Sequence, residues 1–263
     1  MKLFDFAYCP SFKFKIDYLA GLCPEDWGKP DSFKSNPVLH NYVKHTFSKL
    51  YGDYESAAQE EKGTFIKIAE GKYLTFNLGL YDTNWQRMFA YFVPHTPESD
   101  SDAKGWKLDA FYNEYQLSAM GISDLPQKAK YFTDISELLL DISYNIIPQY
   151  DHIFGDENNN QRIPESIRDS HMKAAFFETA IASAKKRIDE NYKVAVPQYY
   201  DGKIQLLLHM YLTNPSKPDL ALALSRDEEN KCYLGHTCIT MEWAYNNARL
   251  IAKPNSDWLH PNA

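Results

Sequence analysis

One stretch near the middle of the chain, Tyr150 to Arg162 (YDHIFGDENNNQR), gathers residue types that acid–base chemistry requires. It holds one imidazole, three carboxylates, three asparagine amides, a glutamine and a guanidinium around a single glycine, Gly155. A surface turn needs turn-forming residues, whereas a catalytic or ligand-binding loop needs acids, bases and a cation held close together. The other interpretation is an acidic, solvated turn that ends at Arg162, and the residue types alone favour neither.

We expect this stretch to be a loop, because the amides of residues 158–160 compete for the backbone and disfavour a helix. A new helix is expected to start after Pro164. If the stretch is catalytic, His152 would be the general acid or base, and Asp156 and Glu157 would hold a metal or activate water. The surrounding carboxylates are expected to raise the pKa of His152, because negative charge favours the protonated imidazole.

Several well-defined site motifs are absent from the sequence. It has no Walker loop, dinucleotide-binding glycine motif, nucleophile elbow or HExxH zinc motif. The segment Asp156 to Asn160 resembles the start of a calcium loop, but Gln161 and Ile167 replace the required glycine and glutamate. Since His152 and Asp156 are four residues apart, they could share Mg²⁺ or Mn²⁺, although two ligands are a weak signal.

The distribution of charge limits the class of ligand. The 263 residues carry a net charge of -7. Residues 96–165 hold 5 basic and 13 acidic side chains, whereas residues 1–95 and 166–263 are nearly balanced. An acidic protein is a poor non-specific binder of nucleic acid, so any such contact must be local or the ligand small.

The four cysteines form no CxxC pair, which disfavours a zinc ribbon and a thioredoxin-type redox site. We expect free thiols in a reducing cytosol. Residues 1–15 lack the long apolar segment of a signal peptide, and no apolar run approaches membrane-spanning length. The sequence therefore predicts a cytoplasmic protein without a membrane partner.

The elements that must position the central stretch follow the same order in both halves of the chain. Each half is expected to have a helix, a hairpin with a Gly-Lys turn and two further strands. The predicted helices are Pro37–Tyr51, capped by Asn36, and Glu165–Asn191. The predicted strands are 64–69, 73–80, 87–93 and 106–112 in the first half and 194–199, 204–212, 220–224 and 232–239 in the second. Residues 116–131 are expected to be irregular, and residues 134–141 to form a short helix.

This order predicts an α+β fold with antiparallel sheets and packed helices. We interpret the repetition as an internal duplication of a helix-plus-four-strand unit. Residues 1–263 would form one compact domain of two similar halves, about 1–144 and 145–263. A pseudo-twofold pair of sheets would leave a central cleft, which the 150–162 stretch would cross.

The last predicted helix, Thr240 to Ala252, contains Asn246 and Asn247 at interior positions and Arg249 on a neighbouring turn. These groups indicate either buried hydrogen bonds that clamp the helix to the sheet or contacts with a ligand. Near the second hairpin, aromatic and amide side chains could stack on bases and read their edges. Arg162 or Lys193 could neutralise phosphate charge. The predicted ligand-binding residues are Asn77, Arg162, Lys193, Gln198, Tyr199, Tyr200, Lys203, Gln205, Asn246, Asn247 and Arg249.

Five segments resemble an uncharacterised, mainly bacterial family, the domain of unknown function 3825. They are LFDFAY (3–8), FNLGL (76–80), DHIFGDENNNQR (151–162), AVPQYYDGKIQLLL (195–208) and TCITMEWAYNNARLIAKPNSDWL (237–259). The family tends to have Asn-Thr-Gly-Leu where this chain has Asn77-Leu78-Gly79-Leu80, so this chain lacks the hydroxyl at position 78. The resemblance implies an association with OST-HTH (LOTUS) and cold-shock-like RNA-binding modules, and so with RNA metabolism, stress or conflict systems. It carries over no catalytic residues.

Three functional classes remain. The favoured one is an RNA- or nucleotide-binding protein that holds its ligand in the cleft between the halves. The alternative is a metal-assisted phosphodiesterase or nucleotide hydrolase that uses His152 with Asp156 and Glu157. The third is an interaction protein whose polar motifs serve folding.

Overall fold

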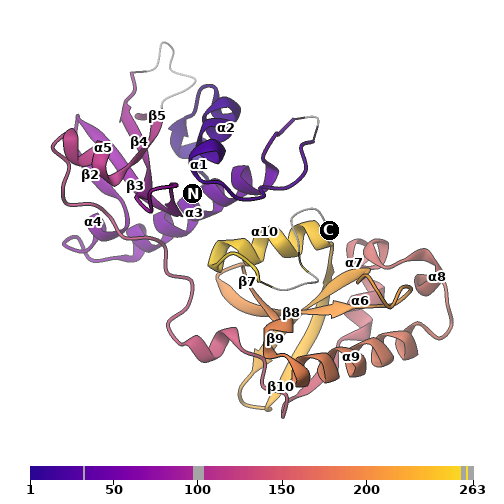
Figure 1. Cartoon of the computed structure of the whole chain (residues 1–263). Coiled ribbons are helices and arrows are strands. Elements are labelled where there is room, and N and C mark those ends of the chain that lie inside the picture. The colour runs from indigo at the N-terminus through magenta and orange to yellow at the C-terminus, as the bar shows by residue number, and fades with distance from the viewer. Residues whose placement is uncertain (32, 97–103, 256–258, 260–263) are drawn as a thin grey trace. The chain divides into compact units, whose positions relative to one another are not determined.

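The computed structural model describes residues 1–31, 33–96, 104–255 and 259. The chain consists of two compact units, Met1–Ala129 and Lys130–Ala263 (Figure 1). The segment from residue 130 to 144 belongs to the second unit because it packs there: the Tyr131 ring lies 4.7 Å from Tyr199, and the Asp141 amide donates to the Tyr233 hydroxyl. The expected division near residue 144 therefore differs from the division observed.

The first unit contains one five-stranded sheet in the order β1-β5-β4-β3-β2. β1 is parallel to β5, and the other neighbours are antiparallel. Its strands are β1 (Ala7–Tyr8), β2 (Lys67–Ala69), β3 (Tyr73–Tyr81), β4 (Arg87–Pro94) and β5 (Trp106–Asn113). Its helices are α1 (Leu3–Phe6), α2 (Phe12–Leu22), α3 (Pro37–Ser56), α4 (Lys62–Phe65) and α5 (Glu114–Ala119).

The second unit also contains one five-stranded sheet, in the order β6-β10-β9-β8-β7, with β6 parallel to β10 and the rest antiparallel. Its strands are β6 (Asn145–Pro148), β7 (Val196–Tyr200), β8 (Lys203–Met210), β9 (Leu220–Asp227) and β10 (Cys232–Ile239). Its helices are η2 (Ile135–Leu138), α6 (Tyr150–Gly155), α7 (Glu157–Arg162), α8 (Glu165–Arg168), α9 (Lys173–Glu190), η3 (Tyr192–Val194) and α10 (Met241–Ile251).

The two sheets therefore share one topology. In each, a short first strand precedes the long helix, α3 or α9, and pairs in parallel with the last strand of a four-stranded antiparallel meander. The predicted α+β class with antiparallel sheets is confirmed, and the shared topology is compatible with an internal duplication. Both predicted hairpins are present, and Gly71, Asp201 and Gly202 adopt the positive φ that tight hairpin turns require.

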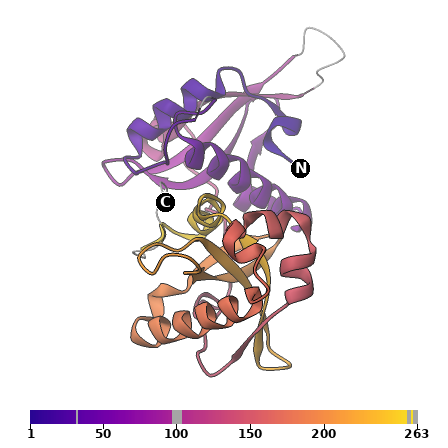
Figure 2. The same cartoon turned by 90° about the vertical axis from the view of Figure 1, so that its right-hand side faces the viewer.

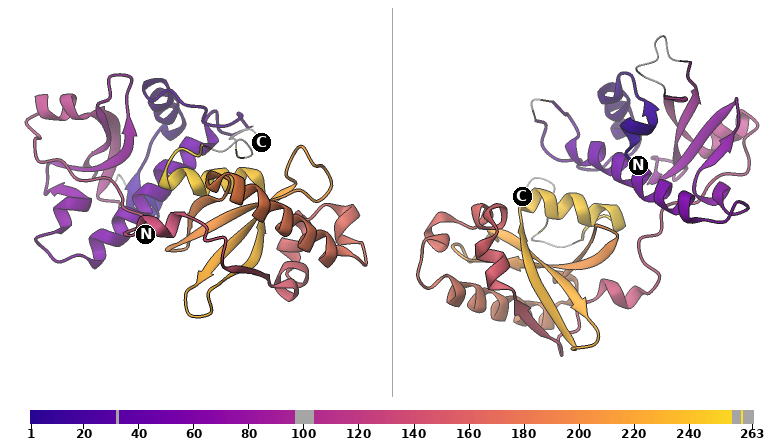
Figure 3. Two further views of the ribbon diagram at one scale, coloured as in Figure 1. Left: turned by 60° about the horizontal axis from the view of Figure 1, so that its bottom comes forward. Right: turned by 180° about the vertical axis from the view of Figure 1, so that it is seen from behind.

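Each sheet is covered by a long helix on one face and by the helix that follows its last strand on the other. In the second unit, Phe177 and Ile188 of α9 share a core with Leu206 and Leu208 of β8. Because side chains alternate along a strand, Leu207 and the residues two positions from it in β8 point to the other face, where α10 lies. Figures 2 and 3 show these three layers, with α10 and α9 on opposite sides of the sheet.

The main correction concerns residues 150–162, which form two short helices and not a loop. Asp156 lies between them as the N-cap of α7, and its carboxylate accepts a hydrogen bond of 2.8 Å from the backbone N–H of Asn159. The low helix propensity of consecutive asparagines is offset by this cap and by tertiary contacts of the Asn159 side chain.

Three further boundaries differ from the sequence prediction. The helix expected over 165–191 is interrupted after α8, where the Ser170 hydroxyl accepts from the Met172 amide and competes with helical hydrogen bonding. The strand expected from residue 64 begins only at Lys67, because α4 precedes it. Asn36 precedes α3 as predicted, but its amide donates to Asp17 and makes no capping bond.

Some short elements were not predicted. The α2 helix, the two parallel strands β1 and β6 and the α5 helix all fall in segments that the sequence left irregular or unassigned. Among the described residues, no helix combines the length and apolar character that a membrane span requires.

Candidate functional site

The two short helices α6 and α7 lie against β10, and the α7 side chains continue the edge of the sheet. β6 pairs with β10 only as far as Pro148, opposite Gly235. Beyond that point the Asn159 side chain donates to the His236 carbonyl at 3.1 Å and accepts from the Cys238 amide at 3.1 Å. Asn159 therefore satisfies backbone groups that a longer β6 would otherwise bind.

Arg162 completes this edge and also contacts an aromatic ring. Its guanidinium donates to the Cys238 carbonyl at 2.8 Å and lies 4.7 Å from the ring centroid of Trp243 in α10. The indole is 52% exposed. The guanidinium is thus fixed by the backbone on one side and by a cation–π contact on the other, next to an aromatic surface that solvent reaches.

A β-bulge places a second histidine beside this edge. The register between β10 and β9 shifts between Gly235 and Thr237, so His236 is the extra residue. Gly235 is required there, because a Cβ atom would lie 2.9 Å from the Leu222 side chain. The bulge directs the His236 imidazole onto the α10 face, where Nε2 lies 3.2 Å from the Ser225 hydroxyl.

Ser225 is the end of a row of amides that crosses the sheet beneath α10. The Asn247 amide donates to Gln198 at 3.2 Å, and Gln198 donates to Gln205 at 2.8 Å. Gln205 then donates to the Ser225 hydroxyl at 3.0 Å. We call these four residues the amide row, and it links α10 to His236 through one continuous hydrogen-bonded path.

His152 of α6 lies next to His236. Their ring centroids are 6.4 Å apart and the rings are nearly perpendicular, at 81°. His152 is exposed and His236 is half-buried. Burial lowers the pKa of His236, and the positive charge of a protonated His152 lowers it further. The bulged imidazole is therefore biased toward its neutral form.

We call His152, Arg162, His236 and Trp243 the β10 patch. The Cys238 thiol lies behind it, where burial raises its pKa to about 12, even though Arg162 acts in the opposite direction. Because a thiolate and not a thiol is the nucleophile, this cysteine does not serve as one at neutral pH.

The structure brings five of the predicted site residues into these two connected groups. They are His152 and Arg162 in the β10 patch and Gln198, Gln205 and Asn247 in the amide row. Their contacts are structural as well, since Arg162 binds a backbone carbonyl and Gln198 is buried.

The predicted carboxylates have local roles. One Asp156 carboxylate oxygen caps α7 by accepting from the Asn159 backbone N–H. One Glu157 carboxylate oxygen accepts from the Gln161 side-chain amide at 3.2 Å. Within the described ranges, no three His, Cys, Asp or Glu side chains come together as a metal-binding group. A metal site at His152, Asp156 and Glu157 stays a prediction.

The remaining predicted residues lie apart from the β10 patch. Asn77 belongs to the first unit, where its side chain donates to the Pro126 carbonyl and accepts from the Gly79 amide. Tyr199 points to the opposite face of β7 from Gln198 and contacts Tyr131. The others are distributed over exposed positions and α10.

The remaining predicted residues are Lys193, Tyr200, Lys203, Asn246 and Arg249. Lys193 is exposed, with its ammonium 5.9 Å from the Tyr192 ring. Tyr200 and Lys203 are exposed and pair across the β7–β8 hairpin. Asn246 donates to the Glu242 carbonyl within α10, and Arg249 is buried.

Sequence reasoning missed His236, Ser225 and Trp243. A glycine followed by histidine inside a strand, Gly235-His236, is a signal for a bulge that re-aims a side chain. Ser225 had no comparable signal, because its partner is defined only by the register between β9 and β10.

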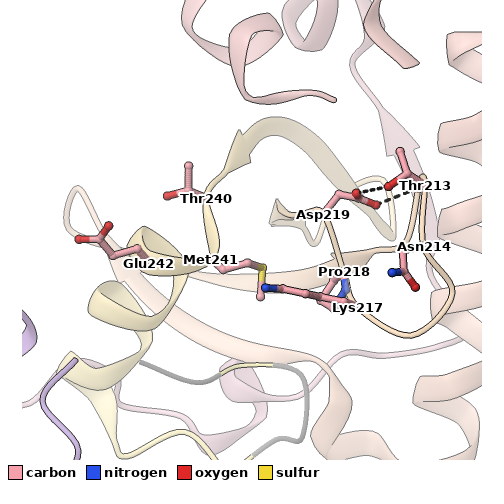
Figure 4. A pocket seen from close by; sticks show the side chains of 8 residues that line it. All are labelled: Thr213, Asn214, Lys217, Pro218, Asp219, Thr240, Met241 and Glu242. Carbon is pink, nitrogen blue, oxygen red and sulfur yellow. Dashed lines mark hydrogen bonds between the residues drawn. The ribbon is translucent and has the colours of Figure 1, made fainter. Parts of the chain in front are cut away.

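A separate polar pocket of about 520 Å³ lies at the start of α10 and beside the β8–β9 connection (Figure 4). The Asp219 carboxylate organises that connection by accepting from the Leu212 and Thr213 amides. The pocket is lined by Thr213, Asn214, Lys217, Pro218, Asp219, Thr240, Met241 and Glu242. It shares α10 with the amide row but none of the predicted site residues line it.

The family described as Domain of unknown function (DUF3825) matches residues 20–258, nearly the whole chain. No curated protein and no solved structure matches the chain.

Proposed function

We propose that this chain, which belongs to the family described as domain of unknown function DUF3825, binds single-stranded RNA or a nucleotide through the β10 patch. The observation that carries the proposal is the Arg162–Trp243 pair, which Asn159 links to the backbone of the paired histidines His152 and His236. An exposed aromatic ring, a fixed guanidinium and two imidazoles are the groups that contact bases and phosphates.

The chemistry of the patch suits an unpaired nucleotide. Trp243 offers an exposed ring on which any base can stack, and stacking on aromatic side chains is the common way to hold splayed bases. Arg162 and His152 can neutralise a phosphate next to that base. The contact is local, which is consistent with a chain whose overall net charge of -7 disfavours extended nucleic acid.

The amide row supports the proposal by holding this surface in place. Gln198 is buried and Gln205 is half-buried, so their hydrogen bonds are protected from competing water. The row fixes His236 relative to α10, which also carries Trp243. A preorganised surface loses less entropy on binding than a flexible one. We further propose a cytoplasmic location, which the four free cysteine thiols support.

The test is a binding titration with fluorescein-labelled single-stranded RNAs and with nucleoside mono- and triphosphates, read by fluorescence anisotropy. Removing one base–aromatic stack costs roughly 1–3 kcal/mol, so Trp243→Ala should weaken RNA binding by about 5- to 150-fold. The matched control is Trp85→Ala, an exposed tryptophan of the first unit, which should leave affinity unchanged.

Titrations with EDTA and with Mg²⁺ or Mn²⁺ separate the remaining classes. Product formation that requires the metal and is lost in Asp156→Asn would favour the metal-assisted hydrolase. Absence of binding to every RNA and nucleotide would contradict the proposal and favour an interaction protein.

A further inference from the structure

We infer that His152 and His236 form an acid–base pair that cleaves bound RNA without a metal, by attack of a ribose 2′-hydroxyl on the adjacent phosphodiester. This inference rests on the proposed RNA binding and adds a reaction at the same patch. It differs from the sequence-based alternative, because it replaces the two carboxylates by a second histidine that the β10 bulge brings next to His152.

The spacing of the two rings suits a group held between them. At a centroid separation of 6.4 Å the imidazoles cannot hydrogen-bond directly to each other, but each can reach an oxygen that lies between them. Phosphoryl transfer proceeds with the attacking and leaving oxygens roughly in line on opposite sides of phosphorus. One ring can therefore serve the attacking oxygen while the other serves the leaving oxygen.

His236 is oriented as a catalytic base must be. In the tautomer that this inference requires, Nε2 carries the proton and donates it to the Ser225 hydroxyl, which also accepts from Gln205. Nδ1 is therefore the nitrogen left to face a substrate. A base whose other nitrogen is held by a third group is the arrangement that catalysis by histidine generally uses. Ser225 and Gln205 are positioning residues, because they act through His236.

The surroundings of His236 assign the two roles. The groups that contact its imidazole are His152 from α6 and Ser225 from β9, and neither is a carboxylate. Burial and the neighbouring His152 lower the pKa of His236, so it is neutral near pH 7 and can accept a proton. His152, which is exposed, is then the acid.

The reaction balances with these two groups alone. Nδ1 of His236 takes the proton of the 2′-hydroxyl, and the 2′-oxygen forms a bond to phosphorus. The bond from phosphorus to the 5′-oxygen breaks, and that oxygen takes a proton from the His152 imidazolium. The products are a 2′,3′-cyclic phosphate and a 5′-hydroxyl, and solvent restores both histidines to their starting protonation states.

The experiment incubates the full chain with a short single-stranded RNA in EDTA and identifies the product ends by mass spectrometry. We expect a 2′,3′-cyclic phosphate and no cleavage of the same RNA carrying 2′-O-methyl groups. General acid–base catalysis contributes about 10²–10⁴-fold, so His152→Ala and His236→Gln should each lower the cleavage rate by that factor. His236→Gln is chosen because its amide can occupy the position of Nε2 and preserve the bond to Ser225.

The controls separate failure of this inference from failure of the binding proposal. His171→Ala, an exposed histidine of the same unit, should cleave at the wild-type rate. The uncleavable 2′-O-methyl RNA measures binding independently. His236→Gln and His152→Ala should both still bind it, His152→Ala more weakly because it loses one phosphate contact. His152 is exposed, so its loss should not disturb folding, which a thermal unfolding scan checks.

Three results would overturn the inference. If the 2′-O-methyl RNA binds but RNA is not cleaved in EDTA, or only with added Mg²⁺ or Mn²⁺, the patch binds without this chemistry. If His152→Ala or His236→Gln cleaves at the wild-type rate, the pair is not the catalyst. If no RNA binds, both the inference and the proposed function fail.

Discussion

The two units have the same strand order but use one face of the sheet differently. In the first unit, the face toward α5 is largely apolar and aromatic, with Phe89, Tyr91, Leu117 and Ile122 forming a small core. In the second unit, the face toward α10 carries the amide row and ends at the β10 patch. One scaffold therefore supports an apolar, aromatic face in one copy and, in the other, a packed face crossed by a row of hydrogen-bonded amides.

This difference matters because a buried amide row contributes little to stability. A hydrogen bond within a protein contributes about 0.5–1.5 kcal/mol net, and apolar side chains of the same shape can replace a bonded pair at nearly no cost. The first unit shows that the same topology folds with an apolar face. The amides of the second unit are therefore best explained by what they position, namely His236.

The largest expected loss of stability concerns the sheet face that a long helix covers, which has the same architecture in both units. Phe47 in the first unit and Phe177 in the second are fully buried between a long helix and its sheet. Because truncation leaves a large cavity, Phe47→Ala and Phe177→Ala should each destabilise the protein by about 3–5 kcal/mol. Urea unfolding measures the loss, and hydrogen exchange shows which unit opens. A much smaller loss in one unit would contradict the common architecture.

The next effect is the pH dependence of stability, to which half-buried His40 contributes in the first unit and buried His209 in the second. Burial lowers the pKa of His40 and of His209 to about 4, from 6.5. Between pH 6.5 and 4 the unfolded chain binds more protons than the folded chain, so stability decreases as pH falls. For His209, which is 1% exposed, the loss is roughly 3 kcal/mol by pH 4.

The measurement is the free energy of unfolding at pH 7, 6, 5 and 4. His209→Leu should flatten this pH dependence, whereas His171→Leu, at an exposed position, should leave it unchanged. An unaltered slope in His209→Leu would show that this imidazole does not control acid stability.

A smaller loss of stability is expected at the edge of β10, where the Asn159 side chain takes the place of a neighbouring strand. Asn159→Ala leaves the His236 carbonyl and the Cys238 amide without their partner. A buried group left unpaired costs about 1–3 kcal/mol, so the free energy of unfolding should fall by that amount. Asn158→Ala, its exposed neighbour, should change stability by less than about 0.5 kcal/mol. Equal effects would contradict the role of Asn159.

The sequence could predict the elements that local contacts define, and it could not predict those that depend on long-range contacts. The meanders and hairpins were predictable, because alternation and the Asp201-Gly202 turn are local signals. The helices of residues 150–162 were not, since α7 depends on contacts between Asn159 and a strand far along the chain. Likewise His152 was identified as a candidate from its neighbours, but His236 joins it only through the β10 bulge.

The smallest expected effect on stability is the sharpest test of why the second unit keeps amides. Gln198 and Asn247 are bonded to each other, so the double variant Gln198→Leu/Asn247→Leu removes both partners and leaves neither unpaired. Like the apolar face of the first unit, it should fold with a change in stability below about 1 kcal/mol. Gln205 is half-buried and can replace its lost bond with water.

RNA binding should nevertheless weaken, because the row no longer fixes His236 relative to α10. Single Gln198→Leu is the control, and it should cost more than the double variant because it leaves the half-buried Asn247 side chain without its protein partner. Urea unfolding with RNA anisotropy measures both quantities, and a double variant that binds RNA like the wild type would show that the amide row serves folding alone.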